Sequence, residues 1–161
     1  MVKKFIKLLI SMTQHYNHKK YWKMRAAIQA GKGSLIVRVY YLYLIKKMDA
    51  FNGASFGTHI DKSAFFATPP KLPHGIRGIF VSHNAVVGKD STIFHQVTIG
   101  EGNDGAPTIG DNCFIGAGAK IIGKITIGNN VRIGANCIVC EDIPDNCTVV
   151  MEMPRIICRK N

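Results

Sequence analysis

Three histidines lie close together in a stretch that is otherwise rich in Ile, Val and Gly: His74, His83 and His95, within residues 72–100. Imidazole is the side chain that gains and loses a proton near neutral pH, which makes it the commonest general base in enzymes. A neighbouring imidazole can add a hydrogen bond to a substrate or to the base itself. The chemistry therefore depends on whether the fold brings two of these side chains together.

Around the histidines, apolar β-branched residues recur every six positions. Ten positions in this phase are all Ile or Val: Val81, Val87, Ile93, Ile99, Ile109, Ile115, Ile121, Ile127, Ile133 and Val139. A period of six does not fit the α-helix but is a multiple of the strand period of two. Short strands joined by tight turns, each coil stacked on an earlier one, satisfy the pattern. Hexapeptide repeats of this kind are typical of a β-helix.

The fifth place of each repeat is small or apolar, as at Ala85, Ala119, Cys113 and Cys137. We expect both cysteines to point inward as small core residues. Cys137 and Cys140 have the spacing of half a zinc motif, but no second pair accompanies them. The sequence therefore predicts no metal site.

Four segments resemble the hexapeptide-repeat acyltransferases, and more narrowly their serine acetyltransferase-like branch, which includes enzymes of surface-polysaccharide synthesis. They are LPHGIRGIFVSHNAVVG (72–88), IFHQVTIG (93–100), GAPTIGDNCFIGAGAKIIGKITIGNNVRIGANCIV (105–139) and EDIPDNCTVV (141–150). The resemblance runs from about residue 58 to the end. It implies a left-handed parallel β-helix, acetyl-CoA as acyl donor, and a homotrimer with active sites between subunits.

In that family one coil takes 18 residues. The residue one coil before Ile93, at the same interior position, should therefore be residue 75, which is a Gly. The nearest residue suited to an interior position is Leu72, and nine residues separate it from Val81. We therefore interpret GIRG (75–78) as part of a three-residue insertion that places Leu72 one coil below Ile93. His74 and His95 then project on the same face, about 4.8 Å apart. His83 belongs to a different rung and faces elsewhere.

The resemblance implies roles for this pair. The family's general base is the His of a leucine–any–His segment, which His74 matches. It is expected to take the proton of an acceptor hydroxyl that attacks the thioester directly, while backbone N–H groups hold the oxyanion. His95 stands where the branch usually has Gln, and it is predicted to bind the acceptor or to tune His74.

Several family residues are replaced in this chain. His59 stands where an Asp orients the base, with Asp61 close by. Pro73 replaces an Asp that stands just before the base, and Ala106 replaces a His that helps to hold serine. We therefore expect a sugar hydroxyl, most simply of a surface-polysaccharide precursor, as the acceptor, with L-serine (cysteine biosynthesis) as the alternative.

Further acceptor contacts are predicted in a four-residue insertion between Ile99 and Ile109, because loops on rigid scaffolds often carry function. The candidate acceptor-binding residues are His59, Asp61, Asn103 and Asp104.

The resemblance also places coenzyme A in a groove between subunits, against the coil backbones and the C-terminal tail. Small residues there would let the pantetheine arm approach, and basic residues would meet its phosphates. The candidates are Gly116, Ala117, Gly118, Ala119, Lys120, Gly134, Ala135, Arg155 and Lys160.

The first 50 residues lack the six-residue period and have helical patterns. Val2, Phe5, Leu9 and Met12 are spaced for one helical face. Residues 18–30 form a second helical segment, and Ser34 can cap a third that runs to about Met48. We expect these helices to cover the first coil. The predicted organisation is a basic α-helical region (1–55), the β-helix (56–150) and a C-terminal tail (151–161).

Positive charge is concentrated in this helical region. Residues 1–50 contain eleven Lys and Arg against one acid, Asp49, whereas the whole chain has a net charge of +11. Such a region favours an anionic partner, although a solvated basic face explains it equally well. We expect a cytoplasmic protein with reduced thiols and no nucleic-acid partner. Peripheral contact with the inner membrane face, near a lipid-linked glycan, is a hypothesis.

Two other function classes remain as alternatives. A zinc enzyme like the γ-type carbonic anhydrases shares this fold, but it needs three metal-binding histidines, two of them close in sequence, and no His follows His95. A non-catalytic scaffold is the other, against which the predicted pairing of His74 with His95 argues.

Overall fold

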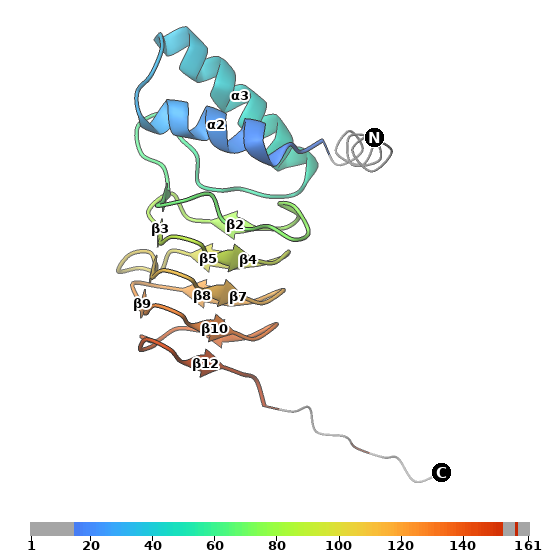
Figure 1. Cartoon of the computed structure of the whole chain (residues 1–161), viewed down its shortest axis with the longest axis vertical. Coiled ribbons are helices and arrows are strands. Elements are labelled where there is room, and N and C mark those ends of the chain that lie inside the picture. The colour runs from blue at the N-terminus through green and yellow to red at the C-terminus, as the bar shows by residue number, and fades with distance from the viewer. Residues whose placement is uncertain (1–14, 153–156, 158–161) are drawn as a thin grey trace.

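The computed structural model describes residues 15–152 and Ile157, and it consists of two helices followed by a parallel β-solenoid (Figure 1). The solenoid is the β-helix predicted from the repeats, with the three parallel sheets that stacked coils of this kind form. The helices lie across its N-terminal end, and the chain leaves it at the opposite end. The predicted helix containing Val2, Phe5, Leu9 and Met12 falls outside the described residues.

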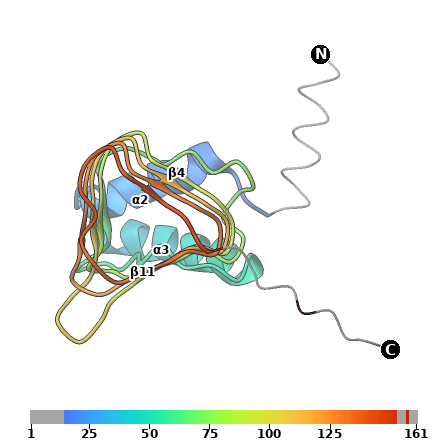
Figure 2. The same cartoon turned by 90° about the horizontal axis from the view of Figure 1, so that it is seen from below.

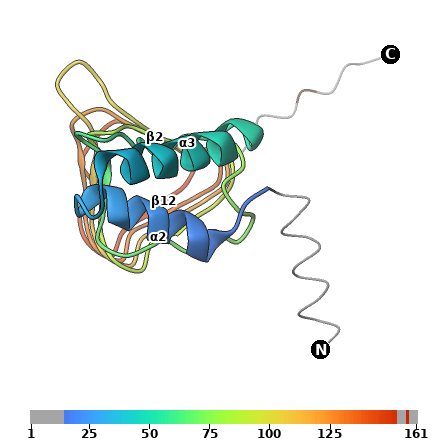
Figure 3. The same ribbon diagram turned by 90° about the horizontal axis from the view of Figure 1, so that it is seen from above.

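Both helices begin at a side-chain cap. Helix α2 (His18–Gln29) follows Asn17, whose side chain accepts a hydrogen bond from the Lys20 backbone N–H. Helix α3 (Leu35–Phe51) follows Ser34, which accepts from Val37 N–H as the sequence predicted. The α3 helix runs three residues beyond the expected end at Met48. In Figure 3, α2 and α3 lie side by side over the end of the solenoid.

The solenoid has three faces, each a four-stranded parallel sheet. Face 1 contains β1 (Phe65–Phe66), β3 (Val86–Val87), β6 (Thr108–Ile109) and β9 (Thr126–Ile127). Face 2 contains β4 (Thr92–Ile93), β7 (Phe114–Ile115), β10 (Arg132–Ile133) and β12 (Thr148–Val149). Face 3 contains β2 (Phe80–Val81), β5 (Thr98–Gly100), β8 (Lys120–Ile122) and β11 (Ile138–Val139). Viewed along its axis the solenoid is triangular (Figure 2).

The six-residue period fills the interior. All ten Ile and Val positions of the repeat are buried, and each lies in a strand of one of the three faces. Cys113 and Cys137 are buried at the fifth places, which confirms that they are core residues. Each coil therefore covers the apolar side chains of the next, and the backbone bonds between coils hold the stack.

The corner between faces 1 and 2 is built from polar residues in left-handed backbone conformation. Asn112, Asn130 and Asn146 have φ of 55°, 57° and 61°. Asn tolerates this region better than most residues because its short side chain can hydrogen-bond locally. The Asn112 side chain donates to Asn130 Oδ1 and Asn130 donates to Asn146 Oδ1, both at 2.9 Å. These bonds link three successive coils.

A buried cation joins the helices to the first coil. Arg25 on α2 is fully buried and donates to the Phe56 carbonyl (2.7 Å), the Thr58 hydroxyl and the Ala64 carbonyl. One of the basic residues of the N-terminal region is therefore structural. Ser55 already pairs with Phe80 of face 3, only four residues after α3 ends. The proposed division into regions 1–55, 56–150 and 151–161 stays a prediction.

Candidate active site

The predicted insertion is present and sets the register of the histidines. Lys71 pairs with Thr92, and Ile93 N–H donates to the Lys71 carbonyl at 2.9 Å, so Leu72 lies opposite Ile93. Residues 73–78 form a turn that leaves the coil between faces 2 and 3. Gly75 and Gly78 have φ of 70° and 64°, a conformation that glycine adopts without strain.

His74 and His95 are neighbours at this corner. Their ring centroids are 4.9 Å apart with an interplanar angle of 59°, which confirms the predicted juxtaposition. His74 is exposed and also contacts the Phe94 ring, with centroids 5.6 Å apart. His95 is half-buried, and its Nδ1 is buried without a hydrogen-bond partner among the described residues. An unpartnered buried imidazole nitrogen is unusual in a folded protein, which marks the pair as a candidate site.

The two imidazoles open into a surface depression of about 580 Å³. Its lining residues are Pro73, His74, Arg77, Gly78, His95 and Gln96. Sequence reasoning missed Arg77, because it was interpreted only as part of the insertion. A cation three residues after the candidate base, within the same insertion, is the signal that could have identified it. Its exposed guanidinium offers a fork of donors to a carboxylate or a phosphate.

The coenzyme A candidates lie along the same corner, one and two coils further on. Gly118 N–H donates to the His95 carbonyl at 3.0 Å, and Asn136 N–H donates to the Ala117 carbonyl at 2.8 Å. The turns that carry His74, His95, the segment 116–119 and the segment 134–136 thus form one column, which we call the His74 corner. Lys120 also reaches this corner, and its Nζ donates to the Gln96 carbonyl at 2.8 Å.

Close stacking explains some of these small residues without a ligand. A Cβ added at Gly116 would lie 2.7 Å from Ala135 N, so the coils could not approach as they do. Gly134 is less crowded, with its nearest neighbour at 3.1 Å. Their contact with coenzyme A stays a prediction. The other two candidates, Arg155 and Lys160, lie outside the described residues.

His59 and Asp61 lie elsewhere, at the corner between faces 3 and 1. Within one chain His59 packs against His83, with ring centroids 5.6 Å apart, so His83 does have an imidazole partner. His59 and Asp61 line a second, separate depression together with Lys62 and Ser63. Partial burial, and then the charge of Lys46, lower the pKa of His59 below its ordinary value. Their predicted role in acceptor binding is untested.

A carboxylate lies close to this second pair. Glu101 accepts hydrogen bonds from the Asn84 amide (2.8 Å) and from the Ser82 hydroxyl (3.0 Å). These bonds hold the pKa of Glu101 below its usual range, so it stays ionised at neutral pH. No sequence motif pointed to this arrangement, because its three residues come from adjacent coils.

The four-residue insertion projects from the same corner, which we call the loop corner (Figure 2). Gly102 N–H donates to the Gly105 carbonyl at 2.9 Å, which closes the base of the loop. Asn103 and Asp104 are exposed at its tip. One chain therefore places the catalytic and coenzyme A candidates at one corner and the acceptor candidates at another, with face 3 between them.

The part of the chain that the structure describes contains no group of three His, Cys, Asp or Glu side chains that could hold a metal ion. No helix in this part is long and apolar enough to cross a membrane.

Residues 106–141 match the family model described as bacterial transferase hexapeptide (six repeats). A serine acetyltransferase from Staphylococcus aureus is 33% identical over 139 residues, which cover 84% of this chain and 55% of the relative. Another from Synechococcus elongatus is 41% identical over 92 residues, covering 55% of this chain and 37% of the relative.

Solved structures give the same result. Serine acetyltransferase from Neisseria gonorrhoeae in complex with serine aligns with a TM-score of 0.66 and 31% identity, covering 83% of this chain and 52% of that one. The Brucella abortus enzyme in complex with coenzyme A aligns with a TM-score of 0.67 and 26% identity, covering 89% and 55%. The chain spans about half the length of these relatives.

Proposed function

The chain belongs to the hexapeptide-repeat acyltransferase family, in its serine acetyltransferase-like branch, and on this premise we propose that it is an acetyl-CoA-dependent O-acetyltransferase. The observation that carries the proposal is the contact between His74 and His95 above a column of small residues. An exposed imidazole with a second imidazole beside it provides a base and a hydrogen-bonding group for one hydroxyl.

The reaction needs few steps. His74 takes the proton of the acceptor hydroxyl while the oxygen attacks the thioester carbonyl of acetyl-CoA. The new C–O bond forms, the C–S bond breaks, and the imidazolium returns the proton to the departing thiolate. Backbone N–H groups of the surrounding turns are suited to hold the oxyanion that develops between these events. No covalent enzyme intermediate is required.

L-serine is the acceptor that the comparisons support best. The relatives are serine acetyltransferases, and the Neisseria structure contains serine. This support is stronger than that for the polysaccharide acceptor expected from the sequence. Arg77 gives this chain a cation beside His74 that can pair with the serine carboxylate.

A sugar hydroxyl is the second candidate. Ala106 stands where the resemblance places a His that helps to hold serine, and Pro73 stands where it places an Asp just before the base, so two side chains of the serine-type pattern are missing. An uncharged acceptor would have less need of them. The open depression of about 580 Å³ beside His74 has room for a monosaccharide.

We also propose the trimer expected from the resemblance. A cyclic assembly joins two different patches of neighbouring chains, so the His74 corner of one chain can meet the loop corner of the next. This arrangement would complete each site with His59, Asp61, Asn103 or Asp104 of a neighbour. Face 3, which lies between the corners, exposes 49% of Phe80 and 72% of Ile138, as an interface requires.

An acceptor screen tests the proposal. Thiol release from acetyl-CoA is followed with L-serine and with a panel of free and nucleotide-linked sugars, and the acetyl ester is identified by mass spectrometry. We expect at least one hydroxyl acceptor to raise thiol release about tenfold over the acceptor-free rate. Acceptor-independent release with every compound would contradict the assignment.

Arg77→Gln distinguishes the two acceptors. Loss of charge-assisted hydrogen bonds to a carboxylate raises KM for L-serine on the order of tenfold or more. KM for a neutral sugar should change by less than about threefold. An unchanged KM for serine in an enzyme that uses serine would remove Arg77 from the acceptor site.

A further inference from the structure

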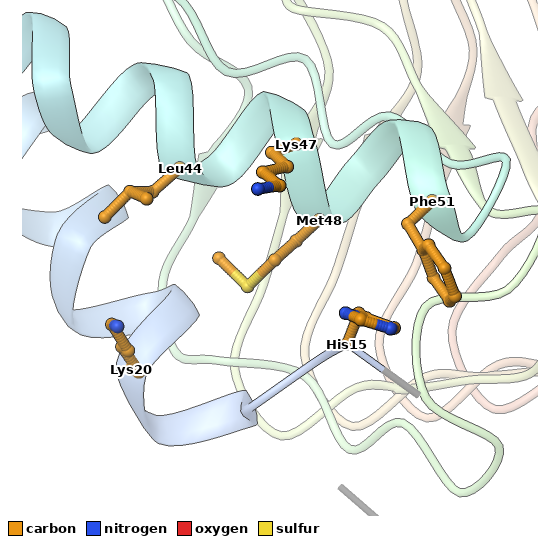
Figure 4. A pocket seen from close by; sticks show the side chains of 6 residues that line it. All are labelled: His15, Lys20, Leu44, Lys47, Met48 and Phe51. Carbon is orange, nitrogen blue, oxygen red and sulfur yellow. The ribbon is translucent and has the colours of Figure 1, made fainter. Parts of the chain in front are cut away.

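A groove between the two helices has no role in the proposed acetyl transfer. One part of it, about 430 Å³, is lined by His15, Lys20, Leu44, Lys47, Met48 and Phe51 (Figure 4). In Figure 4, Lys20 from α2 and Lys47 from α3 lie on either side of the hollow, and the Met48 side chain extends between them. The second part, about 320 Å³, shares Lys20 and Leu44 and adds Lys23 and Tyr40. We call both parts together the inter-helix groove.

The outer face of α3 continues this groove as an exposed apolar surface. Ile36 exposes 81% and Tyr43 exposes 60% of its area. They belong to a larger set of exposed apolar side chains on α3: Leu35, Ile36, Val37, Val39, Tyr40, Tyr43 and Phe51. So many exposed large apolar side chains on one helix indicate an interaction site.

The exposed charged side chains on the two helices have one sign. Lys19, Lys20, Lys23 and Lys47 are exposed on the two helices. The one acid among the first 50 residues, Asp49, is buried and accepts a hydrogen bond from Tyr21 at 2.8 Å. The surface therefore combines aliphatic and aromatic side chains with uncompensated cations.

The combination of cations with apolar side chains indicates which kind of partner can bind this surface. A second copy would bring one set of lysines against another. Residues 1–14 contain Lys3, Lys4 and Lys7 without an acid, so they would add positive charge to the groove. Nucleic acid would use the cations but leave the aliphatic residues Ile36 and Val39 exposed.

We propose that the inter-helix groove and the outer face of α3 bind the surface of an anionic lipid bilayer. A phosphate-bearing head group lies between Lys20 and Lys47, and the apolar side chains of α3 enter the boundary between head groups and acyl chains. Tyr40 and Tyr43 are side chains that favour this boundary. The inference is independent of the proposed acetyl transfer.

The arrangement of the chain fits such contact. The helices form one end of the solenoid, and the coils extend away from them (Figures 1 and 3). The His74 corner lies on the side of the solenoid, so contact through the end leaves the depression beside His74 open. The helices lie on the bilayer surface in this arrangement and do not cross it.

Vesicle co-sedimentation of the full chain tests the proposal. Neutral phosphatidylcholine vesicles are compared with vesicles that contain phosphatidylglycerol, at low and high salt. We expect binding to the anionic vesicles only, weakened by salt. Lys20→Gln/Lys23→Gln/Lys47→Gln should lower the affinity on the order of a hundredfold, because each lysine near a charged surface contributes about 1 kcal/mol.

Two further variants distinguish the contribution of local charge to vesicle binding from that of net charge and of apolar burial. Lys62→Gln/Lys89→Gln/Lys124→Gln removes the same charge from exposed positions of the solenoid and should change the affinity less than about threefold. Ile36→Gln/Tyr43→Gln keeps the charge and should lower the affinity about tenfold or more, through lost apolar burial. Thermal unfolding shows that each variant retains the native fold.

Three results would overturn the proposal. The native chain could fail to sediment with anionic vesicles. The solenoid variant could lose as much affinity as the helix variant, which would indicate an effect of net charge alone. The Ile36/Tyr43 variant could retain full vesicle affinity while its oligomeric state changes, or while labelled RNA binds tightly, which would assign the surface to a second copy or to nucleic acid.

Discussion

The imidazole rings of His74 and His95 lie 4.9 Å apart, although 21 positions separate them in the sequence. Each ring projects from the turn between faces 2 and 3, and successive coils stack these turns. The contact exists because residues 73–78 lengthen one coil by three residues. Without the insertion, His74 would not lie opposite His95.

His95→Gln tests the division of labour in the pair. A Gln amide can donate and accept hydrogen bonds but cannot carry the proton of the reaction. We therefore expect kcat to stay within about tenfold of the native value while KM for the acceptor rises. Steady-state kinetics with the acceptor found in the screen measure both. A loss of kcat as large as that of His74→Ala would make His95 a base in its own right.

Arg25→Ala should destabilise the junction between the helices and the first coil. The truncation leaves the Phe56 carbonyl, the Thr58 hydroxyl and the Ala64 carbonyl without their buried donor. We expect a loss of about 3–5 kcal/mol in the free energy of unfolding, measured by urea denaturation at fixed protein concentration.

The matched control for Arg25 is Lys19→Ala, at an exposed position of the same helix, which should change the stability by less than about 0.5 kcal/mol. Arg25→Lys retains the charge but lacks the guanidinium fork, so it should still be destabilised. Equal stability of all three variants would show that the junction does not depend on this cation.

The raised pKa of Asp49 leads us to predict that the stability of the protein depends on pH. Burial raises its pKa to about 6, against the opposing effect of the Tyr21 hydrogen bond. A carboxyl with a raised folded-state pKa binds a proton more readily in the native than in the unfolded state. Its contribution is therefore fully present below pH 4 and is lost as pH rises through 6, a change of up to about 3 kcal/mol.

The measurement compares the native protein with Asp49→Asn between pH 4 and pH 7, so that effects of other acids cancel. Relative to this variant, the native protein should gain stability as the pH falls from 7 to 4. A difference between the two proteins that is constant over this range would contradict the shifted pKa.

Asn130 tests the corner between faces 1 and 2. Asn130→Ala removes the side-chain bonds to Asn112 and Asn146 and leaves a residue with a Cβ at φ 57° without the polar side chain that lets Asn tolerate this conformation. We expect a loss of about 2 kcal/mol, and a smaller loss for Asn130→Gly, since glycine adopts this conformation without strain. Asn103→Ala, at the exposed loop tip, is the control. Thermal unfolding in which the Ala and Gly variants are equal would exclude backbone strain as the cause.

The parts of the structure that could be predicted are those with a pattern visible over a short stretch of sequence, such as a repeat or a helix cap. The Ile and Val positions identified every coil from Val81 to Val139, because a fixed interior must recur with the period of the backbone. Ser34 identified the start of α3 through its cap. Leu72 located the insertion, and with it the contact between His74 and His95.

The sequence did not predict contacts that depend on irregular coils. His83 meets His59 because Ser55 pairs with Phe80, 25 positions later, which no repeat of six indicates. The burial of Arg25 depends on carbonyls of the first coil more than 30 positions away. Arg77 lies inside an insertion, where periodicity gives no information on direction. Arg25 was counted among the basic residues of the N-terminal region, for which composition left a solvated face and an anionic partner equally open.

The most direct test of the account is the turnover of His74→Ala beside the native protein, with the acceptor identified by the screen and with acetyl-CoA in excess. The account predicts that kcat falls by a factor on the order of 10²–10⁴, the usual contribution of a general base, while the melting temperature stays within about 2 °C because the side chain is exposed. A folded His74→Ala protein that transfers acetyl groups at the native rate would contradict it.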